Sequence, residues 1–220
     1  MPTSLLDPAC TPASIEERSF AIIDEEAGQN APFKGDAWQV ARRLVHTAGD
    51  LSLLQDLVLP DAAVEAGVRA LRAAAPVYTD TEMVRAGIPL RRMDPLGVSV
   101  SCVMTRAGLG EEAGRLGTTR ARAGILALGP ALAGAIVAIG NAPTALLALL
   151  EYVERGGTPP ALVIGMPVGF VNAAESKEML LQCSVIPSLV LRGRRGGSPL
   201  AAAAVNALAC LALERGCVRA

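Results

Sequence analysis

The sequence predicts an α/β fold, in which a mainly parallel five-stranded sheet is flanked by helices and preceded by an N-terminal helical segment. Two observations carry this prediction. From about residue 76 onward, short apolar runs alternate with helical segments, as expected of strands joined by right-handed crossovers. Within these runs, polar and apolar residues do not alternate, which is typical of strands covered on both faces.

The N-terminal helices are predicted from caps and apolar spacing. Residues 14–17 (Ser-Ile-Glu-Glu) resemble a capped start, and apolar residues follow at helical spacing to Ala27. Asp36 is expected to cap a second helix that runs to His46, before Gly49 closes it. Asp61 is expected to cap a third. The helices predicted after the second cover residues 62–75, 81–86, 110–132, 144–155, 173–183 and 199–214.

The five strands are expected at residues 76–78, 98–104, 135–139, 161–164 and 188–191. Ligands collect beyond the carboxyl ends of the strands in open parallel sheets, so the turns there are the expected place for chemistry. Gly140 and Gly165 permit close backbone approach, Asn141 suits a helix cap and Pro143 suits a first helical turn. Free backbone N–H groups at these turns would suit a ligand with several carboxylates or phosphates.

The composition indicates one domain and argues against several classes of protein. The chain has 220 residues, 51% of them hydrophobic, and a formal net charge of -1. It has no basic stripe with interleaved aromatic residues, which argues against nucleic-acid binding. Glycines and prolines divide the most apolar region, residues 125–150, into pieces too short for a membrane span. We expect a loose leader over residues 1–13, one domain over 14–215 and a short tail over 216–220.

The cysteines and the N-terminus favour a cytoplasmic protein. The five cysteines are scattered and form no C-x-x-C pair, which favours reduced thiols and disfavours a zinc site. No basic start precedes an apolar run at the N-terminus, so no signal peptide is expected. Neither a metal nor a cofactor is predicted.

His46 is the only histidine of the chain. With a reference pKa of about 6.5, histidine can donate or accept a proton near neutrality. The alternative is a partly exposed histidine that the negative helix end favours. Arg120 could pair with carboxylates bidentately or lie on a solvated helix face. The segment 192–199 (RGRRGGSP) is a plausible anion nest.

Familiar nucleotide and hydrolase motifs are missing from the sequence. No G-x-x-x-x-G-K-[ST] loop occurs, no turn reads G-x-G-x-x-G, and G-x-S-x-G is absent. Phosphate-loop and acyl-transfer enzymes are therefore poorly supported, and dinucleotide binding has only weak support.

Six motifs of the sequence stand out together. They are ERSFAII at 17–23, VHT at 45–47, DTEMV at 80–84, IGNAPTAL at 139–146, GMPVGFVNAAESK at 165–177 and GRRGGS at 193–198. In this order they resemble the motifs of the precorrin-8X methylmutase family, and the resemblance runs from about residue 14 to 213. The long motifs at 139–146 and 165–177 make chance agreement improbable. Asn172 departs from the family pattern, in which glycine is frequent at this place.

The resemblance implies a cofactor-independent isomerase of cobalamin biosynthesis. A methyl group moves from C-11 to C-12 of the macrocycle, giving hydrogenobyrinate or its cobalt-containing counterpart, in a homodimer whose active sites lie where the subunits meet. His46 would be the catalytic residue that exchanges a proton with a ring nitrogen. The residues that would line or bind the tetrapyrrole are Ser19, Arg43, Met83, Arg120, Asn141, Gly165 and Gly169.

Two alternatives remain open from the sequence. A corrinoid-binding or escort protein without catalysis needs only the helix ends and arginines that hold a polycarboxylate. A nucleotide-binding α/β enzyme of another reaction class is the second alternative. The sequence also leaves open whether the substrate contains cobalt.

Overall fold

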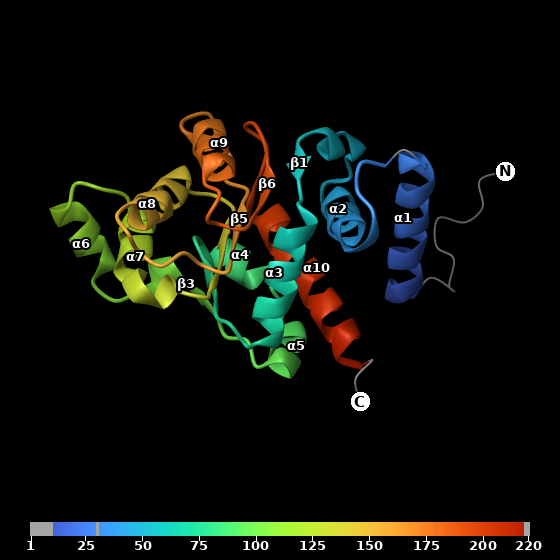
Figure 1. Ribbon diagram of the computed structural model, residues 1–220, viewed down its shortest axis with the longest axis horizontal. Coiled ribbons are helices and arrows are strands. Elements are labelled where there is room, and N and C mark those ends of the chain that lie inside the picture. Colours follow the sequence, from blue (N-terminus) through green and yellow to red (C-terminus); the bar gives the residue numbers. More distant parts are fainter. Residues whose placement is uncertain (1–10, 30, 218–220) are drawn as a thin grey trace.

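A computed structural model describes residues 11–29 and 31–217 of the chain. Its centre is a six-stranded sheet of order β1-β6-β5-β4-β2-β3 (Figure 1). The strands are β1 (Leu57–Val58), β2 (Val77–Thr79), β3 (Val100–Cys102), β4 (Ile136–Ile139), β5 (Leu162–Gly165) and β6 (Ser188–Leu191). Neighbouring strands are parallel except for β1, which pairs antiparallel with β6. The prediction of a mainly parallel α/β sheet is confirmed.

Helices cover both faces of the sheet. The longer N-terminal helices are α1 (Pro12–Ala27), α2 (Gly35–Ala48) and α3 (Asp61–Arg72), followed by the short α4 (Glu82–Ala86) and α5 (Leu90–Met93). Those that follow β3 are α6 (Leu109–Arg115), α7 (Arg120–Leu128), α8 (Pro143–Glu154), α9 (Ala173–Gln182) and α10 (Ser198–Cys217). One core joins α2, α3 and α10 to one face of the sheet, and another joins α7, α8 and α9 to the opposite face.

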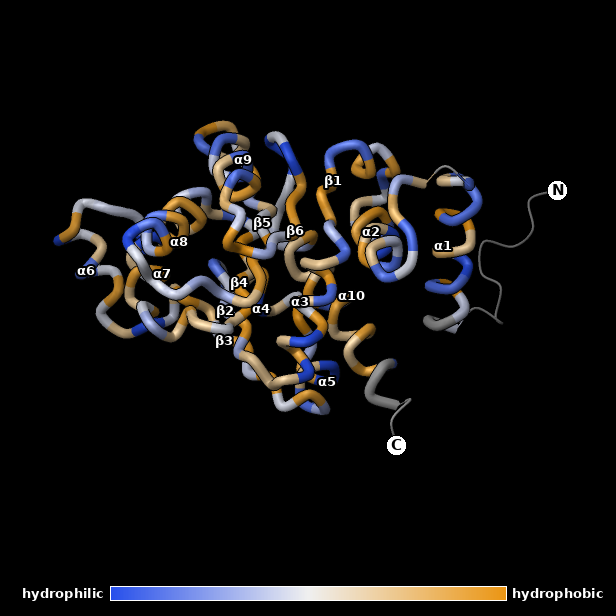
Figure 2. The backbone as a smooth tube through the Cα atoms, viewed as in Figure 1, coloured by the Kyte–Doolittle hydropathy of each residue, from blue (hydrophilic) through white to orange (hydrophobic). Residues whose placement is uncertain are grey.

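The strands owe their burial to this double cover. Every residue of β4, β5 and β6 is buried. Along β4, Ile136 and Ala138 belong to the first core, whereas Val137 and Ile139 belong to the second. In Figure 2, the apolar residues are concentrated in the strands and in α10. The continuous apolar runs of the sequence are therefore strands with two packed faces.

The structure corrects three element predictions. The sheet has a sixth strand, β1, whose two residues are too few to give a sequence signal. The predicted helix 110–132 is divided into α6, α7 and a 3-10 turn, because Gly117 adopts a φ of 59° and Thr119 caps α7. Thr11, not Ser14, caps α1, so this helix starts inside the predicted leader, of which residues 1–10 lie outside the described residues.

Two further predicted caps differ as well. Lys34 precedes α2 and Pro60 precedes α3, which leaves Asp36 and Asp61 in the first helical turns. Acidic residues there complement the positive end of the helix dipole without capping it. Among the described residues, no helix is both long and apolar enough to cross a membrane.

The chain order of the strands creates a switch point between β2 and β4. From β2 the chain continues to β3 on one side, and then crosses to β4 on the other side of β2. The connections that leave the carboxyl ends of β2 and β4 therefore diverge, which is where open α/β sheets bind ligands.

Candidate functional site

His46 lies in the last turn of α2, with its side chain on the exposed side of the helix. Val40, Ala41 and Leu44 face the core and fix the rotation of the helix, which ends at Gly49 in the left-handed conformation with a φ of 63°. The Phe20 ring of α1 contacts the imidazole edge-on, with 5.3 Å between the ring centroids. The end of α2 thus holds the imidazole against α1.

Two cavities meet at His46. The first, of about 270 Å³, is lined by Ser19, Ile22, Ile23, Glu26, Val45, His46, Gly49, Asp50 and Leu51. The second, of about 290 Å³, is lined by Arg43, His46, Thr47, Gly87, Arg92, Pro199, Ala202, Ala203 and Asn206. The structure therefore brings three of the residues that the family resemblance implies, Ser19, Arg43 and His46, to one place.

The surroundings of His46 are rich in arginine. Arg43 forms an ion pair with Glu16 of α1, and its guanidinium lies 4.7 Å from the centroid of the Phe20 ring. Burial opposes ionisation of Glu16, but the hydrogen bond and charge of Arg43 outweigh it, with Arg92 and His46 adding to the effect. Together they lower the pKa of this carboxyl. This arrangement suits an anionic ligand beside a group that can exchange a proton.

Asp80, which the sequence analysis did not single out, occupies the switch point of the sheet. Its side chain is fully buried just beyond β2. The carboxylate accepts hydrogen bonds from the backbone N–H groups of Gly140 (3.0 Å), Asn141 (2.7 Å) and Ala142 (2.7 Å). Burial raises the pKa of the Asp80 carboxyl, although the three N–H donors oppose the shift.

The position of Asp80 corrects the prediction for the turn after β4. The free N–H groups assigned there to a ligand are occupied by this carboxylate, and Asn141 does not cap α8. The N-cap residue is Ala142, and Pro143 is the first helical residue as predicted. Asp80 accepts from the N–H of Ala142 itself and of the two residues before it, so it fixes the turn that enters α8. A polar residue directly after a strand at a switch point was the available signal.

The other predicted binding residues are spread along the molecule. Met83 is 69% exposed near the start of α4, and Asn141 is exposed before α8. Gly169 lies in the loop between β5 and α9 and donates its N–H to the carbonyl of Arg194. Gly165 is buried in β5, where an added Cβ would lie 2.6 Å from Cδ2 of Leu180, so close packing explains this glycine.

Arg120 lies far from His46 within the chain. It begins α7, donates to the carbonyl of Met104 at 3.2 Å and is exposed. Figure 1 shows α7 and α2 at opposite ends of the molecule. One subunit therefore does not bring Arg120 to the imidazole.

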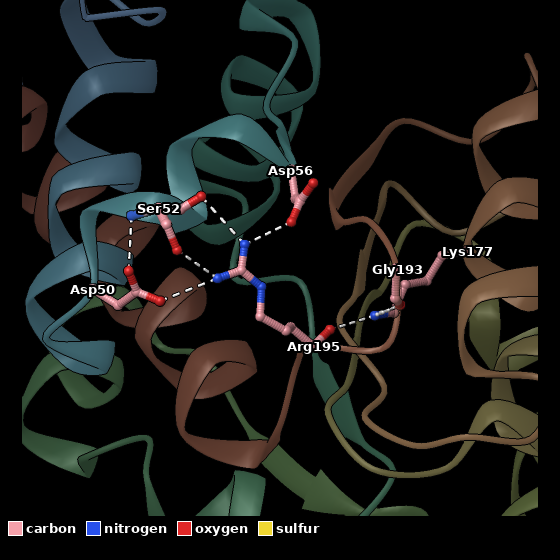
Figure 3. Close-up of polar contacts among 6 residues, drawn as sticks. All are labelled: Asp50, Ser52, Asp56, Lys177, Gly193 and Arg195. Carbon is pink, nitrogen blue, oxygen red and sulfur yellow. Dashed lines mark hydrogen bonds and ion pairs between the residues drawn. The ribbon is translucent and has the colours of Figure 1, made fainter.

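The predicted anion nest at 192–199 is occupied by contacts within the chain. Lys177, fully buried in α9, donates from Nζ to the carbonyls of Gly193 (2.8 Å) and Arg195 (2.6 Å). The guanidinium of Arg195 contacts the carboxylates of Asp50 and Asp56 (Figure 3). Burial disfavours the charged ammonium and lowers the pKa of Lys177 to about 8.

The described residues also bear on the predictions about metals and cysteines. Among the described residues, no group of three or more histidine, cysteine, aspartate or glutamate side chains could hold a metal ion. Cys102, Cys183 and Cys210 are free thiols.

Comparisons with known proteins agree on one family. Residues 14–211 match the family model of precorrin-8X methylmutase. The precorrin-8X methylmutase of Pseudomonas aeruginosa is 44% identical over 197 residues, covering 89% of this chain and 94% of the relative. The cobalt-precorrin-8 methylmutase of Priestia megaterium is 40% identical over 204 residues, with 91% and 88% covered. A precorrin-8X methylmutase structure from Thermus thermophilus has a TM-score of 0.84 at 40% identity, covering 92% of this chain and 99% of that one.

Proposed function

Because the chain belongs to the precorrin-8X methylmutase family, we propose that it moves a methyl group from C-11 to C-12 of precorrin-8X or cobalt-precorrin-8. The product is hydrogenobyrinate or cobyrinate. The observation that carries the proposal is the place of His46, at the meeting point of two cavities and beside Arg43. The reaction is an intramolecular rearrangement within cobalamin biosynthesis.

His46 acts as the proton donor and acceptor of the rearrangement. Its imidazolium gives a proton to a ring nitrogen, which makes the macrocycle electron-poor and eases migration of the methyl group. Once the methyl group is on C-12, the imidazole takes the proton back, so the enzyme ends in its starting state. General acid-base catalysis of this kind contributes about 10²–10⁴-fold. Holding the macrocycle in a reactive shape supplies the remaining acceleration.

The acetate and propionate side chains of the corrinoid give it several negative charges. Arg43 faces these carboxylates in the second cavity, where Arg92 adds a second positive charge. Ser19 lines the first cavity, on the other side of the imidazole. Met83, Asn141 and Gly169 follow the carboxyl edge of the sheet and complete the proposed set of substrate contacts.

A homodimer explains why Arg120 is remote from His46 within one chain. In the proposed assembly, Arg120 of the partner subunit approaches the imidazole, so that each active site contains residues of both copies. The exposed apolar side chains of the neighbouring residues Phe170 (81%) and Val171 (77%) support such an interface, since exposed apolar surface often marks contact sites. The cytoplasmic location that the scattered cysteines favour stays a prediction.

The direct test is anaerobic mixing of the purified protein with precorrin-8X, and separately with cobalt-precorrin-8, followed by absorbance. Conversion to hydrogenobyrinate or cobyrinate is expected, and the faster form identifies the natural substrate. Binding of both forms without conversion would support the escort alternative instead. Thermal stabilisation by nucleotides, with no binding of either corrinoid, would support the nucleotide-binding enzyme.

A further inference from the structure

Lys177 joins α9 to the loop between β6 and α10. Its side chain is fully buried, and both of its acceptors, the carbonyls of Gly193 and Arg195, belong to that loop. Burying an ammonium group is costly unless acceptors replace the lost water, and removing one partner leaves the other unsatisfied. The contact therefore adds little to the free energy of unfolding. Its main effect is to hold the loop in one conformation.

Backbone contacts fix the same loop from a second side. The Gly197 N–H donates to the carbonyl of Met166 at 2.9 Å. A Cβ added to Gly196 would lie 2.2 Å from that carbonyl oxygen, so the loop approaches β5 as closely as only glycine allows. Arg195, which precedes these glycines, consequently has a rigid base.

From this base, the Arg195 guanidinium crosses to the turn that follows α2 (Figure 3). Nη1 donates to Asp50 Oδ2 at 3.1 Å and to Ser52 Oγ at 2.8 Å. Nη2 donates to the Ser52 carbonyl at 3.2 Å and to Asp56 Oδ2 at 2.6 Å. A planar guanidinium can make this set of contacts, whereas the point charge of a lysine cannot.

The turn that Arg195 holds forms a wall of the first His46 cavity, because Gly49 and Asp50 line that cavity together with the imidazole. Asp50 also accepts a hydrogen bond from Ser52 N–H at 2.8 Å, and Gly49 N–H returns to the Val45 carbonyl. A continuous series of contacts thus links Lys177 of α9, through Arg195, to Gly49 and Asp50 at the end of α2.

We propose that Lys177 and Arg195 are positioning residues for His46, which fix the Gly49–Asp50 turn and hold the Asp50 carboxylate away from the imidazole. This inference rests on the proposed function. Without the guanidinium, the Asp50 carboxylate would keep its hydrogen bond from the Ser52 N–H but lose its cation, and it could then accept a hydrogen bond from the imidazole. The charged groups that face His46 are Glu16 from α1, Arg43 from α2, Arg92 from α5, and Glu26 and Asp50 at the first cavity.

The test compares Arg195→Gln, Arg195→Lys and Asp50→Asn in the full-length protein. For Arg195→Gln, we expect kcat to fall about 10- to 100-fold with unchanged affinity for precorrin-8X, as for a small misplacement of a catalytic group. The alkaline limb of the pH profile should move to higher pH, because the free Asp50 charge favours the imidazolium that donates the proton. Arg195→Lys should recover part of kcat, since it restores one ion pair.

A double-mutant cycle shows whether the effect passes through Asp50. The Asp50→Asn/Arg195→Gln protein should lose less activity than the two single losses multiplied together. The matched control is Arg192→Gln, which removes an exposed arginine of the same segment with only a 3.8 Å contact to Glu178, and should leave kcat unchanged.

Three results would overturn the proposal. The first is that Arg195→Gln keeps the kcat and the pH profile of the wild type. The second is that this variant loses affinity for precorrin-8X in parallel with kcat. The third is that the effects of Asp50→Asn and Arg195→Gln on activity simply multiply in the double variant. If Arg195→Gln does not fold, Arg195→Lys is judged by the same criteria, because it retains a cation that can donate hydrogen bonds. Failure of the proposed function is separate, since it requires that the wild-type protein does not convert precorrin-8X.

Discussion

The carboxylate of Asp80 accepts a hydrogen bond from the backbone N–H of Asn141 at 2.7 Å, and this contact joins the ends of β2 and β4 at the switch point of the sheet. Together with the bonds to Gly140 and Ala142, it fixes the turn that enters α8 through a residue 62 positions away. The switch point, which in related folds receives an anionic ligand, is here filled by an anionic side chain. The proposed proton-transfer residue, His46, lies elsewhere, in the last turn of α2.

Asp80→Asn tests the hydrogen bonds of Asp80 to this turn. Asparagine has a single accepting oxygen, so its amide NH₂ would face at least one of the backbone donors. We expect the free energy of unfolding to fall by about 1–3 kcal/mol, the cost of leaving a buried polar group unsatisfied. Denaturant titration of the wild type and the variant measures this difference in the free energy of unfolding. Asp94→Asn, at an exposed position, is the control and should change the value by less than about 0.5 kcal/mol. Equal stabilities of the two variants would contradict this role of Asp80 in holding the turn.

Gly140→Ala tests how closely α10 approaches the turn after β4. The added Cβ would lie 2.7 Å from Ser198 Cα and 2.9 Å from Ser198 N, and backbone atoms cannot move aside cheaply. Destabilisation of about 1–3 kcal/mol is expected from overpacking. Gly110→Ala in α6, with open space around it, should be neutral or stabilise by about 0.5–1 kcal/mol. A Gly140→Ala protein as stable as the wild type would show that the turn has room.

Lys177→Met tests the buried ammonium through the pH dependence of stability. The pKa of Lys177 is about 8 in the folded chain, against 10.5 as the ordinary value. Between these two pH values the unfolded chain binds more protons, so this residue adds stability as pH rises and loses that contribution as pH falls through 8. The advantage of wild type over Lys177→Met should therefore be larger at pH 9.5 than at pH 7.5. A difference independent of pH would contradict the lowered pKa.

Co-expression of His46→Ala and Arg120→Ala subunits tests the shared active site. Each variant alone should be inactive. In a mixed dimer, one site receives both altered residues and the other site neither, so random pairing should restore about a quarter of wild-type activity. Light scattering confirms that dimers form. Complementation should fail if Arg120 and His46 serve the same site from one chain, and that outcome would remove the proposal of an interfacial site.

The sequence predicted β4, β5 and β6 to within one residue, because strands buried on both faces give continuous apolar runs. Other elements gave weaker signals. The two residues of β1 pair only through the tertiary fold. The break before α7 depends on the left-handed Gly117, inside a stretch with a high content of helix-forming residues. Asn172 also has a left-handed φ, of 60°, a conformation that asparagine tolerates better than most residues other than glycine.

The place of His46 in the fold was predictable from local spacing, whereas contacts between distant segments were not. His46 stands at the end of a helix, as the spacing of apolar residues in its helix indicates. The contacts of Asp80 with the turn after β4, and of Arg195 with Asp50, span 61 and 145 positions, so no local pattern reveals them. The distance of Arg120 from His46 likewise depends on how α7 and α2 are arranged around the sheet.

The most direct measurement is single-turnover mixing of precorrin-8X with the wild-type protein and with His46→Ala, followed by absorbance under anaerobic conditions. We predict that both proteins bind the pigment, and that the variant converts it to hydrogenobyrinate at least about 10²-fold more slowly, as expected for loss of a general acid. A His46→Ala protein that binds precorrin-8X and converts it at the wild-type rate would contradict the role of His46 as the proton donor.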